Sequence, residues 1–259
     1  MTKSKNGVCK FCAQEKKLIK AHIIPKKFYL GLKEDRFLLM NSREGTCKFQ
    51  QMGGYDSNIL CSDCDNHILG EFDKEGYKVL FSDFSKYEFV ELQPDYKIYL
   101  IDNTKFDYHK LRNFFISILW RASVSDLEQW SNINLGGYEK KAFEILKGKK
   151  EHNELFKILI YKNKYDEDVN SIVLIAKGKT SKYKKYVIQM AGYRIEVMVD
   201  SSRVSNNYKL QYGRYFLNSE YVSVIETPDV SRRINKEYNA KMFKMYEQGF
   251  VPPKPKGVD

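Results

Sequence analysis

The sequence has no long apolar run, no internal repeat and no glycine-rich phosphate loop. A run of about 18 apolar residues would be needed to cross a bilayer. Residues 1–8 are basic and polar, where a signal peptide would carry an apolar core. We therefore expect a cytoplasmic protein without a membrane partner. The missing repeat excludes a solenoid, and the missing loop excludes a nucleotide hydrolase of the P-loop kind.

Acidic residues are fewer than basic ones: the chain has 33 Asp and Glu and 44 Lys and Arg. The formal net charge of +11 favours a polyanionic partner, since each cation that neutralises a phosphate releases a counterion. We expect DNA; the alternative is that the lysine content reflects only an AT-rich genome. Six lysines are candidates for nucleic-acid contacts, with a merely solvated surface as the alternative: Lys20, Lys26, Lys27, Lys182, Lys184 and Lys185.

Cysteine is scarce, with five in the chain, yet four of them form two Cys-x-x-Cys pairs. Cys9 and Cys12 form the first pair, and Cys61 and Cys64 form the second. Four thiolates complete the tetrahedral shell of a structural zinc ion, and the two-residue spacer lets a tight turn aim both sulfurs at one metal. We predict one four-thiolate zinc site; four unrelated thiols or two disulfides are the alternatives. The fifth cysteine, Cys47, lies in a polar segment and is interpreted as a spare thiol.

A histidine lies between the two pairs, in the segment Ala21-His22-Ile-Ile-Pro25. Proline disfavours helix in the residue before it, so we expect the imidazole to project from a strand or a strand end. A histidine beside apolar residues is often a buried core residue, and this alternative stays open. Asn58 precedes the second cysteine pair by two apolar residues, which places a second polar group near the predicted zinc site.

Together these segments resemble the HNH endonucleases of the ββα-metal class, in the treble-clef-like subgroup of bacterial HNH-like proteins that has a four-cysteine zinc site. The resemblance covers about residues 9–75. It implies that His22 is the general base that activates water and that Asn58 orients its imidazole. It also implies that Asp65 or Asn66, in the first turn after Cys64, holds a catalytic Mg²⁺ or Mn²⁺. Asp73 matches a later acidic residue of this subgroup.

One residue departs from the pattern of many HNH sequences. These have Asp, Glu or His directly before the general base, as a metal ligand, whereas this chain has Ala21. The metal must therefore depend on Asp65, Asn66, His67 or Asp73, or be absent. We expect an active DNA endonuclease; the alternative is a catalytically degenerate, zinc-stabilised protein that binds nucleic acid or regulates. By analogy only, the resemblance suggests restriction or phage defence, with a homo-oligomer or a defence-system protein as partner.

The remaining pattern predicts an α+β protein in two parts. Residues 1–84 would form the zinc-bound ββα unit, whose helix starts near Ser62 and stops at Gly76, and residues 85–259 a mixed domain for target engagement or assembly. Hydrophobic residues make up 42% of the chain, which indicates a packed core. Helices are predicted at 108–123, 138–147 and 233–248, and strands at 87–92, 97–101, 156–161, 171–176, 186–190, 194–199 and 221–225. In the helix at 108–123, we interpret Trp120 and Arg121 as a buried aromatic residue and a paired structural arginine.

Overall fold

The computed structural model of the chain describes residues 6–29, 37–40, 47–50, 54–93, 96–164, 173–178, 183–200, 206 and 212–228. Within these ranges the protein combines helices with a seven-stranded mixed sheet, so the α+β class is confirmed. The predicted helix at 233–248 and Lys182 lie outside the described residues. No helix in the described ranges is both long enough and apolar enough to cross a membrane.

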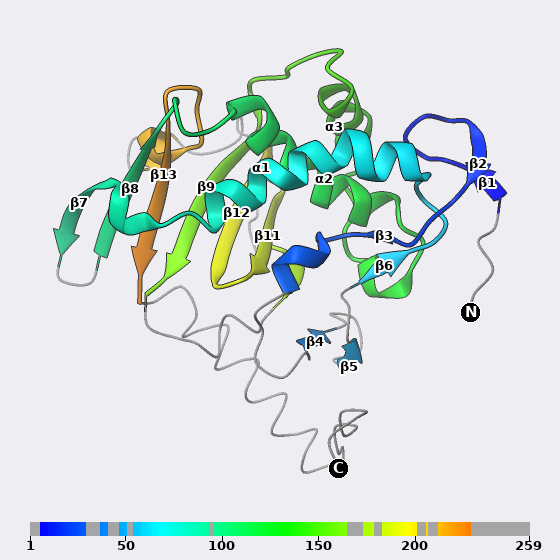
Figure 1. Cartoon of the computed structure of the whole chain (residues 1–259), viewed down its shortest axis with the longest axis horizontal. Coiled ribbons are helices and arrows are strands. Elements are labelled where there is room, and N and C mark those ends of the chain that lie inside the picture. The colour runs from blue at the N-terminus through cyan, green and yellow to red at the C-terminus, as the bar shows by residue number, and fades with distance from the viewer. Residues whose placement is uncertain are drawn as a thin grey trace, which may run out of the picture.

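The large sheet has the strand order β10-β11-β12-β9-β13-β8-β7, and β9 and β13 form its parallel pair (Figure 1). Its strands are β7 (Glu88–Gln93), β8 (Tyr96–Asp102), β9 (Leu155–Asn163), β10 (Leu174–Lys177), β11 (Lys185–Met190), β12 (Tyr193–Asp200) and β13 (Tyr221–Thr227). The central strands carry long apolar runs because both faces are covered. Ile158 and Ile160 of β9 face the main core, whereas Leu159 packs in a smaller cluster with Met198 and Phe216.

Helix α2 (Tyr108–Val124) runs through the middle of the main core. Asp107 caps it by accepting a hydrogen bond from the Lys110 backbone N–H at 3.0 Å. Every residue from Phe114 to Ala122 is buried, so this helix has no solvent face there. It packs on both α1 (Gly70–Leu80) and α3 (Tyr138–Leu146). In Figure 1, α1 runs across the strands of the sheet.

Residues before α1 form short strand pairs in the described ranges. The pairs are β1 (Asn6–Val8) with β2 (Glu15–Lys17), β3 (Ala21–His22) with β6 (Tyr55–Asp56), and β4 (Phe37–Met40) with β5 (Cys47–Gln50). A short 3₁₀ helix, η1 (Lys26–Tyr29), follows β3. A π-helical segment, η3 (Asp63–Leu69), leads without a break into α1. The chain therefore contains a strand pair, β3–β6, followed by a long helix.

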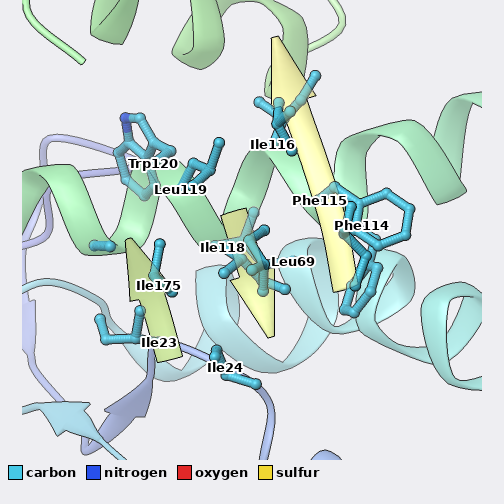
Figure 2. Close-up of a cluster of buried hydrophobic side chains, with 14 of the residues drawn as sticks. Ile23, Ile24, Leu69, Phe114, Phe115, Ile116, Ile118, Leu119, Trp120 and Ile175 are labelled. Atoms are coloured by element: carbon cyan, nitrogen blue, oxygen red, sulfur yellow. The ribbon is translucent and has the colours of Figure 1, made fainter. Parts of the chain in front are cut away.

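The main cluster of buried residues continues across the predicted boundary at 84/85. Ile23, Ile24 and Leu69 lie beside the apolar side chains of α2 (Figure 2). Phe28 stacks on Phe114, with ring centroids 5.2 Å apart. The boundary itself stays a prediction, but residues before and after it share a core.

The predicted helix stop at Gly76 is wrong, because α1 continues to Leu80. Glycine is a weak helix former, which is why the sequence suggested an end here. In the structure a Cβ at Gly76 would lie 2.3 Å from the ring of Phe114. The missing side chain lets α1 approach α2 closely. Packing between the helices therefore outweighs the low helix propensity of glycine at this position.

Candidate functional site

The two cysteine pairs converge on one point. The ligand sulfurs of Cys9, Cys12, Cys61 and Cys64 all lie within 4.8 Å of one another. The Cys12 and Cys61 sulfurs are 4.0 Å apart, and all four thiols are free. A tetrahedral zinc ion with Zn–S bonds of about 2.3 Å needs sulfur separations of about 3.8 Å. The cluster therefore fits a zinc ion. It does not fit the alternative of two disulfides, because all four thiols are free.

Backbone hydrogen bonds hold the two pairs against each other. Lys10 N–H donates to the Ile59 carbonyl at 2.8 Å, and Ile19 N–H donates to the Leu60 carbonyl at 3.0 Å. Ala13 adopts a left-handed conformation, with φ of 59°, and donates its N–H to the Cys9 carbonyl. This tight turn presents Cys9 and Cys12 together, whereas Cys61 precedes η3 and Cys64 lies in its first turn.

The pKa values of the thiols depend on burial and on backbone hydrogen bonds. Burial acts to raise the pKa of Cys9, but backbone hydrogen bonds involving Cys12, Cys61 and Phe11 outweigh it and lower the pKa to about 7. The Cys61 N–H approaches the Cys9 sulfur to 3.4 Å. Burial raises the pKa of Cys61 and of Cys64. Four thiols this close cannot all ionise without a cation between them, which a zinc ion would supply.

A pocket of about 200 Å³ lies beside the cysteine cluster. His22 reaches it from β3, while Asp65 and Asn66 reach it from η3, directly after Cys64. Asp73, eight residues after Asp65, lines the same pocket from α1. The structure thus places in one pocket the four residues that were predicted from the sequence as base and metal ligands. The full lining is His22, Pro25, Lys26, Asp65, Asn66, Gly70, Asp73, Lys74 and Arg121.

Arg121 enters the pocket from α2, far along the chain. Its NH2 group donates to an Asp73 carboxylate oxygen at 2.6 Å and to the Ser117 hydroxyl at 3.1 Å. Its NH1 group donates to the His22 carbonyl at 2.9 Å. From the sequence, Arg121 was predicted to be a paired structural arginine and was not assigned to the site. An arginine inside the apolar stretch that follows Phe114 was the available signal.

The pocket changes the acidity of its carboxyl groups. Burial raises the pKa of Asp65, and the charge of Arg121 acts in the opposite direction. Burial also raises the pKa of Asp73, against the charge and hydrogen bond of Arg121. In the described residues, the four cysteines are the one group of three or more His, Cys, Asp or Glu side chains already close enough to share an ion. His22, Asp65 and Asp73 therefore do not form a second ready cluster.

Asn58 lies elsewhere in the described part of the chain. It is exposed, it is not among the residues that line the pocket, and its backbone N–H donates to the Asp56 carboxylate at 2.8 Å. Asp56 is buried and also accepts a hydrogen bond from Ser125 at 2.6 Å. Asn66 lines the pocket while its amide donates to the Ser62 hydroxyl at 2.9 Å. The orienting role predicted for Asn58 stays a prediction.

The candidate lysines divide into two groups. Lys26 lines the pocket, Lys20 lies over the ring of Tyr55, and Lys27 lies over the ring of Tyr77. The other two make contacts within the protein, outside the pocket lining. Lys184 donates to the Leu135 carbonyl at 3.3 Å, and Lys185 pairs with Glu196 at 3.0 Å.

Comparisons with models of protein families, with curated proteins and with solved structures gave no match for this chain.

Proposed function

We propose that this protein is a metal-dependent, HNH-type endonuclease that hydrolyses DNA phosphodiester bonds. The observation that carries the proposal is the pocket beside the four-cysteine cluster. It combines an imidazole from a strand pair, His22, with carboxylates from the helix that follows, Asp65 and Asp73. This is the order of elements that the resemblance to HNH endonucleases implies.

In the proposed reaction, His22 takes a proton from a water molecule whose oxygen attacks phosphorus. The bond from phosphorus to the 3′ oxygen breaks, which leaves a 3′-hydroxyl and a 5′-phosphate, as the resemblance implies. Histidine suits this task because its ordinary pKa lies near neutral pH. Asp65, Asn66 and Asp73 offer the oxygen ligands that Mg²⁺ or Mn²⁺ prefers. When bound, such an ion stabilises charge on the phosphate and leaving oxygens.

The surroundings of the pocket suit a polyanion. Lys26 and Lys74 line it together with Arg121. Lys20 and Lys27, which are close in sequence to the lining residues His22 and Lys26, lie over aromatic rings, at 5.0 Å from the Tyr55 centroid and 4.9 Å from the Tyr77 centroid. Of these two rings, that of Tyr55 is exposed and that of Tyr77 is half-buried. A cation beside an accessible ring can contact a phosphate while a base stacks on the ring. By analogy, a role in restriction or phage defence would follow.

Cleavage by the wild-type protein tests the proposal. Zinc-loaded protein should convert supercoiled plasmid to nicked or linear forms when Mn²⁺ or Mg²⁺ is added, and EDTA in excess of the added ion should stop it. The nicks should be sealed by DNA ligase, because ligase requires a 5′-phosphate and a 3′-hydroxyl. Protein that cleaves equally well without an added divalent ion, or leaves ends that ligase cannot seal, would contradict the mechanism.

DNA binding should depend steeply on salt. Each cation that touches a phosphate contributes about 0.9 to the slope of log affinity against log salt for duplex DNA. Lys20→Ala and Lys27→Ala should therefore each reduce the slope by about one, measured by fluorescence anisotropy on a labelled duplex. Lys185→Ala is the matched control, because Lys185 already pairs with Glu196. An affinity that does not change with salt would exclude DNA as the partner.

A degenerate DNA-binding protein is the second candidate, and two observations favour it. Ala21, which precedes His22, is buried and has no donor atom. Asp73 is already engaged by Arg121 at 2.6 Å. In that case the salt dependence would remain, while cleavage would be absent with every divalent ion. The plasmid and anisotropy assays together separate the two candidates.

A further inference from the structure

The surroundings of Arg121 are unusual for a charged residue. Its side chain is 1% exposed, and its Nε lies buried without a hydrogen-bond partner among the described residues. A buried guanidinium incurs a desolvation cost, and an apolar residue of similar volume is often at least as stabilising. A role in stability alone therefore explains this arginine poorly. The partners of its other nitrogens indicate what it does.

Two hydrogen-bond partners of Arg121 line the pocket. NH1 binds the carbonyl of His22, and NH2 binds the carboxylate of Asp73. One guanidinium thus joins β3, which carries the proposed general base, to α1, which carries a proposed metal ligand. Its planar fork fixes the two contacts in relation to each other.

A second buried arginine on the same helix provides a contrast. Arg112 is 4% exposed, and it donates to the carbonyls of Glu151, His152 and Leu155 at 2.9 to 3.0 Å. None of these residues lines the pocket. Arg112 therefore ties α2 to the start of β9, whereas Arg121 ties α2 to the pocket.

We propose that Arg121 is a positioning residue that fixes the His22 strand against Asp73, so that the pocket is assembled only when α2 packs on the residues before it. For its effect on cleavage, the proposal rests on the proposed function. It goes beyond the resemblance to HNH endonucleases, which covers about residues 9–75, because a residue outside that segment completes the site.

The charge of Arg121 separates a positioning role from a ligand role. A guanidinium beside Asp73 repels a divalent ion at that carboxylate. Loss of Arg121 should therefore leave the half-saturating Mn²⁺ concentration unchanged or lower it. The same loss should reduce kcat by about 100-fold, since small displacements of a reacting group cost this much. A merely structural role would weaken metal binding and turnover together.

The test compares Arg121→Met and Arg121→Lys with the control Arg112→Lys, all as zinc-loaded full chains. Lysine retains a charge but lacks the fork, so it should recover only part of kcat. Hydrogen exchange should report the same effect without any cleavage. The Ile23 amide, which donates to the Gly54 carbonyl at 3.0 Å, extends the β3–β6 pair. It should exchange at least about tenfold faster in both Arg121 variants and at the wild-type rate in the control.

Each result decides one question. If the wild type cleaves and both Arg121 variants retain kcat and the Ile23 exchange rate, the positioning role is wrong while the proposed function stands. If the wild type does not cleave, the proposed function fails, and the exchange rates alone decide whether Arg121 holds the strand. Unfolding of both Arg121 variants beside a folded Arg112→Lys would overturn the proposal, because Arg121 would then serve stability alone.

Discussion

Cys61→Ser protein should lose both its zinc and the fold around the cysteine cluster. Structural zinc contributes about 10–16 kcal/mol in zinc-finger peptides, which matches or exceeds the whole stability of an ordinary domain, about 5–15 kcal/mol. Purified wild-type protein should contain about one zinc per chain, as the four converging sulfurs imply. Elemental analysis gives the zinc content, and circular dichroism during heating gives the loss of structure.

The loss should extend beyond the cysteine cluster, because the core is continuous. Phe11, between Cys9 and Cys12, packs edge to face on Trp120 of α2 with ring centroids 5.5 Å apart. The Lys10 ammonium donates to the Val124 carbonyl at the end of the same helix, at 2.7 Å. Without zinc, these contacts lose the turn that presents them. We therefore expect a lower melting temperature for the whole protein and a broader transition.

Cys47→Ser is the matched control for this prediction. Cys47 belongs to β5 and to neither Cys-x-x-Cys pair of the sequence, so its replacement should leave zinc content and melting temperature unchanged. Two results would refute the zinc site: wild-type protein that is folded and contains no zinc, or Cys47→Ser and Cys61→Ser proteins that melt alike.

The cysteine cluster could be predicted from the sequence because the spacing of its ligands is a local feature of the chain. A Cys-x-x-Cys spacing constrains two ligands within one turn, and a second pair supplies the rest. The helix at 108–123 was likewise predicted within one residue of α2, since its apolar residues repeat with helical spacing. Asp65 and Asp73 were selected on the resemblance to the HNH subgroup, and their spacing of eight residues permits them to share one broad face of a helix.

Arg121 could not be assigned to the pocket because its partners are distant in sequence. It binds Asp73, 48 positions away, and His22, 99 positions away. Neither periodicity nor propensity carries information about such contacts. The stop predicted at Gly76 failed for a related reason, because the close approach of Phe114 is a tertiary contact. The parallel pairing of β9 with β13 is also a long-range choice that strand patterns do not encode.

His22→Ala should reduce Mn²⁺-dependent nicking of plasmid by about 10²–10⁴-fold, the contribution typical of a positioned general base. DNA affinity and zinc content should stay at the wild-type level, because His22 lies outside the four-cysteine shell. The variant should also melt close to the wild type. His22 is only half-buried, and its carbonyl, which accepts the bond from Arg121, is retained in alanine.

Two further variants test the role of His22: Asp65→Ala as a comparison and His109→Ala as a control. Asp65→Ala removes a proposed oxygen ligand and should raise the Mn²⁺ concentration needed for half-maximal nicking, while His22→Ala should leave that concentration unchanged. His109 is exposed on the first turn of α2 and does not line the pocket, so its alanine variant should cleave like the wild type. If His22→Ala instead unfolds the protein while His109→Ala does not, His22 is a core histidine and its assignment as the base is wrong. If His22→Ala folds and cleaves as well as the wild type, the base must be sought elsewhere in the pocket, where Asp65 is the next candidate.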